Sequence, residues 1–479
     1  MTRLIQIVAA PILISLCLAA PAATPDQENR IQNVEHGLRP AQALTGAAVP
    51  LTTIEGEMRR LHVPGMSVAV IDQSRLAWAK GYGVVTPGGA AVTPETLFQA
   101  ASISKPVVAF GAMTMVQSGQ LDLQADVNSY LRGWELPGNA GSGYVSPLQL
   151  LSHTGGVNVS GFPGYAAGAP LPTLLQVLNG TAPANTEPVR VVSPPGRTWR
   201  YSGGGYTVLQ QMMTNLSGQA FETFMQSHVL KPMGMAASRF NQPADAVTLA
   251  HAAFPHDSAG HPYVGGPFTY PELAAAGMWT TPSDLARFAL GVQASATGTG
   301  GLLDRQHAQK MLTPVLNGYA LGFEMAGSGA ATSFAHGGSN QGYQNYLFGY
   351  VDSGRGAVVM TNGDAGDEVA RATMRSIASE YGWPSNQTRM RKALTISQKM
   401  ARQMVGKYTI EGLGDFEITQ RDGIPVFWIK AGQGEPLYRQ DTTHFFVLSQ
   451  TLALQFDALL GGSGRIVSGP FDLQFKRVR

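Results

Sequence analysis

The sequence has 479 residues, a formal net charge of +2, 44% apolar residues and only 13% charged residues. This length exceeds what one ordinary hydrophobic core occupies, so it predicts two domains, and the composition is that of a folded globular protein and excludes a disordered one. The small net charge provides no strong field that would gather nucleic acid or an anionic membrane, so neither partner is predicted.

Residues 1–23 are predicted to be a signal peptide. Arg3 supplies a positive start, Leu4 to Leu18 is almost continuously apolar, and Ala20-Pro21-Ala22 provides a cleavage site of small residues. An uncleaved membrane anchor is the alternative, which the proline inside the apolar run and the alanine-rich end disfavour. We therefore expect a periplasmic or secreted protein with no stable membrane span after cleavage.

The first half of the mature chain contains a hairpin pattern. Residues 24–45 are polar and rich in proline and alanine, and they predict a loose leader. Apolar spacing from Leu51 to Leu61 predicts a helix. Two β-rich runs, 66–71 and 76–82, are separated by a turn and predict a β-hairpin. The main domain is predicted to span residues 46–385.

The rest of this domain alternates between helical and extended patterns. Residues 157–200, rich in glycine and proline, predict a long loop region, and runs at 342–351 and 355–361 predict a second hairpin. Hairpins flanked by helices indicate the α+β class, with an antiparallel sheet flanked by helices plus a helical region. Helices are predicted at 102–118, 205–217, 219–229, 283–293 and 366–381.

The pattern changes after the predicted closing helix. Residues 386–404 are predicted to be a connector. Residues 405–479 are short strand-like runs broken by turns, which predicts a small all-β C-terminal domain.

Several kinds of site are not indicated. The only cysteine, Cys17, lies in the signal peptide, which excludes disulfides, thiolate nucleophiles and cysteine-bound zinc in the mature chain. His251, His256 and His261 are five residues apart, a spacing that fits neither a helix face nor a strand, and His153 is expected to hold a turn by hydrogen bonding. No metal and no cofactor are therefore predicted, and no G-x-S-x-G or nucleotide-binding glycine motif occurs.

The stretch "ASISKP" places Ser102 three residues before Lys105, one helical turn apart. A serine hydroxyl is a poor nucleophile until a base removes its proton, and a neutral lysine amine can do so. Burial lowers a lysine pKa from about 10.4 by up to roughly 3–5 units, and the flanks of this pair are apolar. A helix N-terminus also offers free backbone N–H groups to an oxyanion. Because this spacing also occurs by chance, the rest of the pattern must decide.

Two later stretches complete the pattern. Residues 201–206 read "YSGGGY", and Tyr201 precedes a predicted helix, so its phenol can point into a cleft. Residues 336–339 read "HGGS" and are followed by a predicted strand, and two glycines at a strand edge let a substrate backbone approach and pair.

In this order the stretches resemble the serine β-lactamase and penicillin-binding-protein superfamily, closest to its class C-like branch, whose pattern is S-x-x-K, then Y-x-N, then K-T-G or H-x-G. The resemblance covers about residues 45–385, and the C-terminal β domain resembles the lipocalin-like module on some members. Further matching stretches are VPGMSVAVI at 63–71, LLSHTGGV at 150–157, LKPMGM at 230–235, GMWTTPSDLARF at 277–288 and VVMTNGD at 358–364.

The resemblance implies roles for four side chains. Ser102 would be the acylating nucleophile and Lys105 its base. Tyr201 would pass the proton to the leaving group and activate the deacylating water. His336 takes the place of the lysine in K-T-G and would bind a substrate carboxylate, or orient Tyr201 and Lys105.

The resemblance also implies roles for backbone groups. The N–H groups of Ser102 and Ser339 would form the oxyanion hole, and Gly337 and Gly338 would line the substrate. Gly203 stands where the family has the asparagine that contacts a substrate's acylamino group. This departure affects β-lactam and peptide recognition more than acyl transfer itself.

We therefore expect an exported serine hydrolase that forms an acyl-enzyme on Ser102. Its small-molecule or peptide substrates would be D-amino-acid peptides, esters or β-lactams. The alternative is a penicillin-binding-type sensor or binder without efficient turnover. A homo-oligomer is left open by the sequence.

Overall fold

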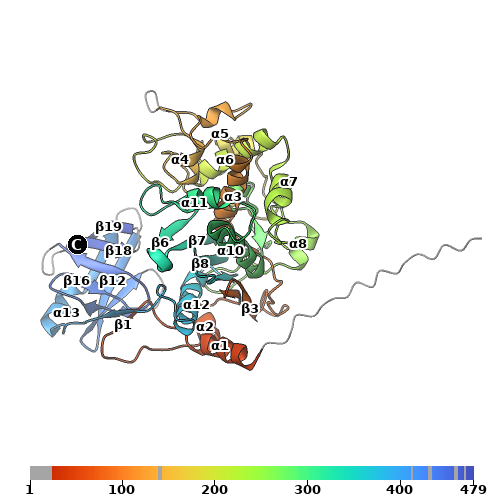
Figure 1. Ribbon diagram of the computed structural model, residues 1–479. Coiled ribbons are helices and arrows are strands. Elements are labelled where there is room, and N and C mark those ends of the chain that lie inside the picture. The colour runs from red at the N-terminus through yellow and green to blue at the C-terminus, as the bar shows by residue number, and fades with distance from the viewer. Residues whose placement is uncertain are drawn as a thin grey trace, which may run out of the picture.

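The computed structural model shows a main domain and a C-terminal β module that lies beside it as a separate lobe (Figure 1). The predicted signal peptide lies outside the described residues. Those residues are 24–138, 143–410, 414–429, 434–457, 462–468 and 471–478.

The main domain is built on a six-stranded antiparallel sheet with the strand order β3-β2-β9-β8-β7-β6. Both predicted hairpins are confirmed, β2–β3 and β8–β9, and β2 pairs with β9 so that the two ends of the domain meet in the sheet centre. The strands are β2 (Gly65–Asp72), β3 (Arg75–Gly83), β6 (Glu324–Ala326), β7 (Ser333–Asn340), β8 (Tyr343–Tyr350) and β9 (Gly356–Thr361).

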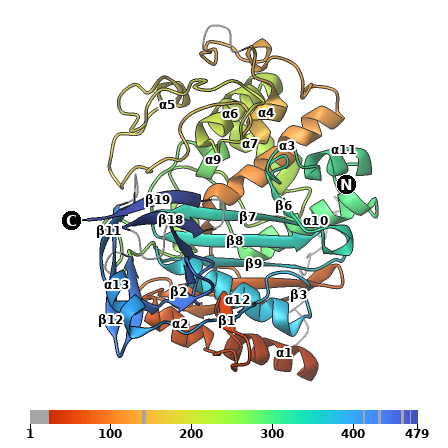
Figure 2. The ribbon, with the colours of Figure 1, turned by 90° about the vertical axis from the view of Figure 1, so that its left-hand side faces the viewer.

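The sheet is covered on both faces, and strand β2 shows why. Its alternate residues Val68 and Val70 pack into one apolar cluster, while Ala69 and Ile71 pack into the other. Since side chains alternate across a strand, a continuously apolar run must be buried on both sides. One face carries α1 (Pro25–His36), α2 (Ile54–Arg60) and α12 (Gly366–Glu380), as Figure 2 shows below the sheet.

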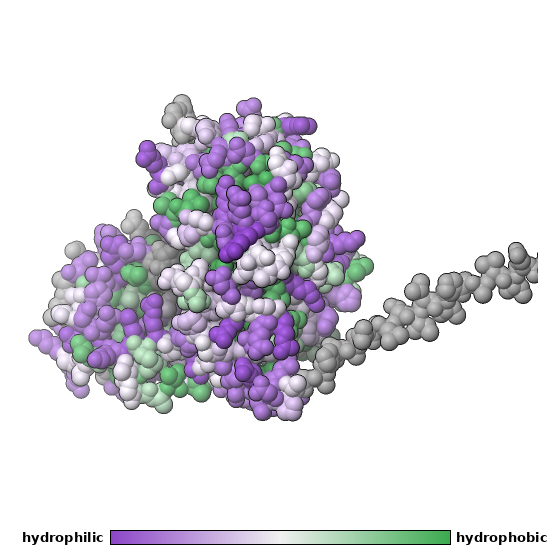
Figure 3. Space-filling model, viewed as in Figure 1, coloured by the Kyte–Doolittle hydropathy of each residue, from purple (hydrophilic) through white to green (hydrophobic). Residues whose placement is uncertain are grey.

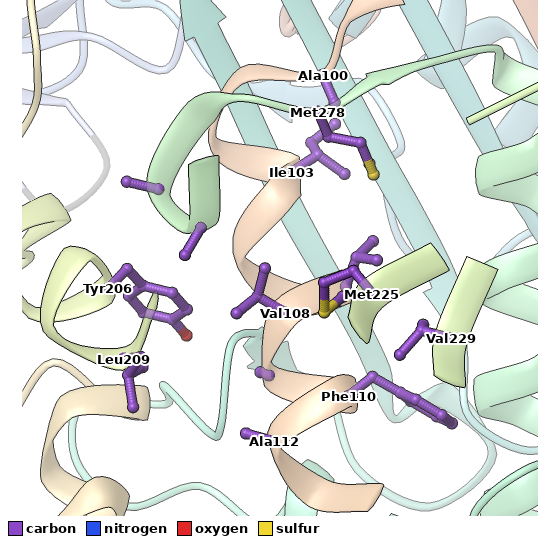
Figure 4. Packing of buried hydrophobic residues seen from close by; sticks show 14 of the residues in the cluster. Ala100, Ile103, Val108, Phe110, Ala112, Tyr206, Leu209, Met225, Val229 and Met278 are labelled. Atoms are coloured by element: carbon purple, nitrogen blue, oxygen red, sulfur yellow. The ribbon is translucent and has the colours of Figure 1, made fainter. Parts of the chain in front are cut away.

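The other face carries the larger helical region, and α3 (Ser104–Gln117) runs through its centre. Every residue of α3 from Ser104 to Met113 is buried, as expected for a helix with no polar face. Figure 4 shows α3 between Tyr206 and Leu209 of α6 on one side and Met225 and Val229 on the other. The other helices of the region are α4 (Pro147–Leu151), α5 (Leu174–Asn179), α6 (Gly203–Ser217), α7 (Phe221–Met225), α8 (Ala246–Ala250), α9 (Leu273–Ala276), α10 (Pro282–Thr297) and α11 (Arg305–Leu312).

Three predicted elements differ in detail. The helix predicted at 102–118 starts as a 3₁₀ turn at Ala101–Ile103 before α3, and the helix predicted at 219–229 becomes α7 followed by a π turn. The loop region 157–200 contains α5, which a capping box at Thr173 and Gln176 starts.

The expectation of a loose leader at residues 24–45 is wrong. Thr24 caps α1, and Val34 of this helix is fully buried against the face that α12 also covers. The segment then forms β1 (Gln42–Leu44), which pairs in parallel with β10 (Arg389–Arg391). Its polar composition hid two apolar residues one turn apart, Ile31 and Val34, which are enough to dock a helix on an existing core.

The C-terminal module confirms the predicted all-β domain. Among the described residues its strands form one antiparallel sheet of near-barrel shape, in the order β14-β13-β12-β11-β19-β18-β17-β16-β15. Aromatic rings fill its centre, with Tyr408 and Phe416 stacked at 4.9 Å. The module follows α13 (Gln398–Met404) and comprises β11 (Gly406–Ile410), β12 (Gly414–Arg421), β13 (Ile424–Ile429), β14 (Glu435–Pro436), β15 (Tyr438–Arg439), β16 (His444–Phe446), β17 (Ala453–Phe456), β18 (Ser463–Ser468) and β19 (Phe471–Arg477).

The N-terminal segment ties the module to the main domain. The buried side-chain amide of Gln42 donates hydrogen bonds to the carbonyl oxygens of Val447 and Gln450, each at 2.8 Å. Its backbone N–H donates to the Leu448 carbonyl at 2.9 Å. Figure 3 shows mixed polar and apolar residues over the visible face of both lobes. Within the part of the chain that the structure describes, no helix has the length and apolar character needed to cross a bilayer.

Candidate active site

The site begins at the tight entry into α3. Strands β4 (Phe98–Gln99) and β5 (Trp279–Thr280) pair just before it, and the Ala100 N–H donates to the Met278 carbonyl at 2.8 Å. Ala101 then adopts a φ of 52°, in the left-handed region. This conformation costs a non-glycine residue roughly 1–2 kcal/mol, and such strain is typical of functional sites. It places Ser102 at the start of the helix.

Ser102 and Lys105 meet as their spacing predicts. Lys105 Nζ donates to Ser102 Oγ at 3.0 Å and to the Ala275 carbonyl oxygen at 2.8 Å. Burial alone lowers the pKa of Lys105 to about 7. A substantial fraction of this amine is therefore neutral at neutral pH, and in the neutral form it can accept the Ser102 hydroxyl proton across the same 3.0 Å contact.

Tyr201 lies against the same amine, since Lys105 Nζ is 4.9 Å from the centre of the Tyr201 ring. Burial raises the pKa of Tyr201 well above its usual value, and hydrogen bonding with Ser102 offsets part of that rise. Tyr201 is thus a neutral phenol at neutral pH. It is suited to pass a proton on, and not to hold a standing negative charge.

His336, on β7, is neutral and deeply buried. Its Nδ1 is 2.6 Å from the Gly337 carbonyl oxygen, which can only accept, so Nδ1 carries the proton. Its Nε2 then accepts from the Tyr319 hydroxyl at 3.1 Å. Burial, together with the charge of Lys105, lowers the pKa of His336 to about 3. A neutral imidazole gives no positive charge for a substrate carboxylate, so the geometry favours the orienting role of the two that we expected.

Two further side chains, those of His153 and Tyr319, belong to this cluster although neither was predicted to lie at the site. The His153 ring centre is 4.3 Å from that of Tyr201 and 4.8 Å from that of Tyr319. His153 does make the expected hydrogen bond, but with Ser202, whose N–H donates to Nδ1 at 3.1 Å. Burial lowers the pKa of His153, so it is a neutral packing partner. The "LSHTGG" stretch pointed to His153, whereas nothing in the local sequence distinguishes Tyr319.

The two glycines of "HGGS" differ in role. A Cβ at Gly338 would lie 2.3 Å from the Ala100 carbonyl oxygen, so glycine is needed for β7 to pack against the turn that carries Ser102. A Cβ at Gly337 would have no heavy atom nearer than 4.0 Å. In the described residues β6 pairs only with residues 333–335 of β7. The edge of β7 around Ser339 is therefore left open to a substrate strand.

The three histidines of the 251–261 region are not part of this cluster. His256 is buried and its Nδ1 donates to the Asn362 carbonyl at 2.9 Å, while His251 and His261 are exposed.

A serine hydroxyl beside a buried lysine with a pKa of about 7 and a buried tyrosine, on an α+β scaffold, defines a serine hydrolase. Residues 52–381 match the Beta-lactamase family, and the chain belongs to that family. Among curated relatives, it is 24% identical over 336 residues to penicillin-binding protein 4 of Amycolatopsis lactamdurans, which covers 67% of this chain and 86% of that protein. It is 23% identical over 240 residues to the protein flp of Staphylococcus aureus strain MW2. That match covers 48% of this chain and 44% of flp, so the chain matches about half the length of such relatives.

Solved structures share the fold at 18–20% identity. The octameric penicillin-binding protein homologue of Pyrococcus abyssi has a TM-score of 0.62 and covers 88% of this chain and 98% of its own. EstCE1, a hydrolase with promiscuous acyltransferase activity, has a TM-score of 0.57 and covers 74% and 98%. The D-amino acid amidase of Ochrobactrum anthropi SV3 has a TM-score of 0.55 and covers 74% and 99%.

Proposed function

We propose that the protein is an exported serine hydrolase that forms an acyl-enzyme on Ser102 and cleaves ester or amide bonds. The observation that carries this proposal is the 3.0 Å contact between Ser102 Oγ and a lysine whose pKa burial brings to about 7. Export is inferred from the signal-peptide pattern of residues 1–23 alone, and a periplasmic or secreted location is proposed with it.

Acylation follows from the contacts around Ser102. Neutral Lys105 takes the hydroxyl proton as Oγ bonds to the carbonyl carbon of the substrate. The tetrahedral oxyanion accepts hydrogen bonds from the backbone N–H groups of Ser102 and Ser339, each donor being worth about 2.7–4 kcal/mol of transition-state stabilisation. The bond to the leaving group breaks, and the proton passes from Lys105 through the Tyr201 hydroxyl to that group.

Deacylation reverses the proton path. A water molecule gives a proton through Tyr201 to Lys105 as its oxygen bonds to the acyl carbon. The Ser102 ester bond then breaks, Oγ recovers the proton, and the carboxylic acid leaves. His336 and His153 act here as positioning residues, because they hold the Tyr201 ring and carry no charge.

Relatives of similar fold support the substrate classes that we propose. EstCE1 is named a hydrolase and the Ochrobactrum protein an amidase for D-amino acids, and both share this fold. We place esters and simple amides, including amides of free D-amino acids, ahead of β-lactams and N-acylated D-amino-acid peptides, because Gly203 has no side chain to bind the acylamino group that both of these carry. A homo-oligomer is also proposed, given that the Pyrococcus abyssi homologue is octameric.

Turnover of nitrocefin and p-nitrophenyl butyrate by the wild type and Ser102→Ala tests the function. We expect butyrate hydrolysis that falls at least about 10³-fold in the variant, because the nucleophile is lost. Intact-mass analysis should show a transient acyl adduct on the wild type only. Equal turnover by the two proteins would remove Ser102 from the mechanism. A stable adduct without turnover would favour the sensor function instead.

A further inference from the structure

At position 203 the superfamily pattern has an asparagine, whereas this chain has a glycine. A neighbouring loop packs directly against this glycine. Gly203 is the first residue of α6, and the loop 158–162 lies against this helix start. The Gly203 N–H donates to the Ser160 carbonyl at 3.2 Å, and the Gly204 N–H donates to the Val159 carbonyl at 3.0 Å. The loop and the helix therefore form one unit two residues after Tyr201.

The ring of Phe162 occupies the space that an asparagine side chain would need. A Cβ at Gly203 would lie 2.9 Å from Cε2 of Phe162 and 3.3 Å from the Ser160 carbonyl oxygen. Contacts of a Cβ below 3.0 Å essentially do not occur in proteins. The ring is partly buried and packs against the main apolar cluster, so it is held in this place.

The loop that carries Phe162 is fixed on its other side as well. The Ser202 hydroxyl donates to the Asn158 carbonyl at 2.7 Å, and the Asn158 side-chain amide donates to the Pro188 carbonyl at 2.9 Å. Val159 has a φ of 58°, a strained conformation that these hydrogen bonds maintain. The backbone just before Phe162 is thus anchored both to the start of α6 and to Pro188.

A phenylalanine ring in the place of an asparagine side chain changes the chemistry of the cleft beside Tyr201. An asparagine amide offers a donor and an acceptor to a peptide-like group, whereas a phenyl ring offers neither. An acylamino substituent placed against the ring loses its hydrogen bonds to water without replacement, which is unfavourable. An alkyl or aryl chain in the same place gains from burial.

We propose that Phe162, over Gly203, is a specificity determinant that makes the acyl side of the cleft apolar. It selects substrates with an alkanoyl or arylalkanoyl group on the scissile carbonyl over those with an N-acylaminoacyl group. The inference rests on the proposed function, since it concerns the acyl group that Ser102 receives.

Two esters with the same leaving group test the proposal. p-Nitrophenyl pentanoate and p-nitrophenyl N-acetylglycinate have acyl chains of equal length, and only the second carries an amide. We expect wild-type kcat/KM to favour the pentanoate by at least about tenfold. The rate of Ser102→Ala with each ester is subtracted, which removes spontaneous hydrolysis from the comparison.

Matched substitutions at the ring make the test specific. Leucine and glutamine are similar in size, so Phe162→Leu should keep the preference, while Phe162→Gln should shift the kcat/KM ratio toward the N-acetylglycinate by about tenfold or more. Phe162→Ala/Gly203→Asn, which removes the ring and restores the amide, should shift it in the same direction. Far-UV circular dichroism and the melting temperature show whether each variant is folded.

The outcomes separate the two proposals. Ser102-dependent hydrolysis of both esters with equal kcat/KM, or an equal ratio in Phe162→Leu and folded Phe162→Gln, overturns the specificity inference and leaves the hydrolase intact. No Ser102-dependent hydrolysis of either ester overturns the proposed function together with it.

Discussion

At the scale of single residues, the site depends on how little charge surrounds Lys105. The only cause of its lowered pKa is burial, and the nearby histidines and tyrosines are all neutral. A carboxylate partner would have raised the pKa and kept the amine protonated. A buried amine in apolar surroundings would destabilise an ordinary core. Here those surroundings lower the pKa of Lys105, so that it can act as a base near neutral pH.

This argument predicts the pH dependence of the reaction. Lys105 is charged and inactive as a base below its pKa of about 7, so kcat/KM for a neutral ester should rise with pH and level off above 8. At pH 6 only about a tenth of the amine is neutral, so about a tenth of the plateau is expected. Lys105→Arg should lose at least about 10²-fold, because a guanidinium does not deprotonate.

Lys399→Arg is the control for this substitution, since Lys399 is exposed on α13. It should retain the wild-type pH profile. A flat profile together with an active Lys105→Arg enzyme would refute the role of the lysine as base.

At the scale of elements, the close approach of β7 to the turn before α3 assembles the site. The two glycines of this strand offer a matched pair of substitutions. Gly338→Ala would place its Cβ 2.3 Å from a backbone oxygen, so the strand or the turn must move, and we expect a loss of about 1–3 kcal/mol in the free energy of unfolding. The Cβ of Gly337→Ala would have no heavy atom nearer than 4.0 Å. We therefore expect this variant to change the free energy of unfolding by less than about 0.5 kcal/mol.

Denaturant unfolding of the two variants measures this difference. Equal midpoints for Gly338→Ala and Gly337→Ala would show that the contact between Ala100 and β7 does not constrain the fold.

The elements also show what the sequence could predict. The hairpins, most helices and the pair Ser102–Lys105 carry local signals, namely strand alternation, caps and a one-turn spacing, and these were predicted. The contacts of Tyr319 and His153 with the site arise when segments far apart in the chain converge, and no local pattern records that. The docking of α1 escaped prediction for a similar reason, because its single buried stripe has meaning only against α12.

At the scale of the whole molecule, the N-terminal segment joins the two lobes through polar contacts of its own. Gln42 is 2% exposed, and its side chain supplies both donors to carbonyls of the module's 447–450 loop. Strand β1 of the same segment also pairs with β10 in the connector. The segment therefore contacts both the connector that leads into the module and the module itself. The likeness to the Pyrococcus abyssi protein covers 88% of the chain, more than residues 1–404 amount to, so it extends into this module.

We therefore expect Gln42→Ala to loosen the module without unfolding either lobe. The buried Val447 carbonyl would lose its donor, which costs about 1–3 kcal/mol because water cannot replace it, while water can reach the half-buried Gln450 contact. Calorimetry should show an unfolding transition that is broader than that of the wild type or more clearly split, and limited proteolysis should cut faster between residues 386 and 404. Gln440→Ala is the matched control, because Gln440 accepts a hydrogen bond from Arg391 at an exposed site, where water substitutes readily. If both variants are cut as slowly as the wild type, the module is held by its apolar contacts alone, and Gln42 only fills space between the lobes.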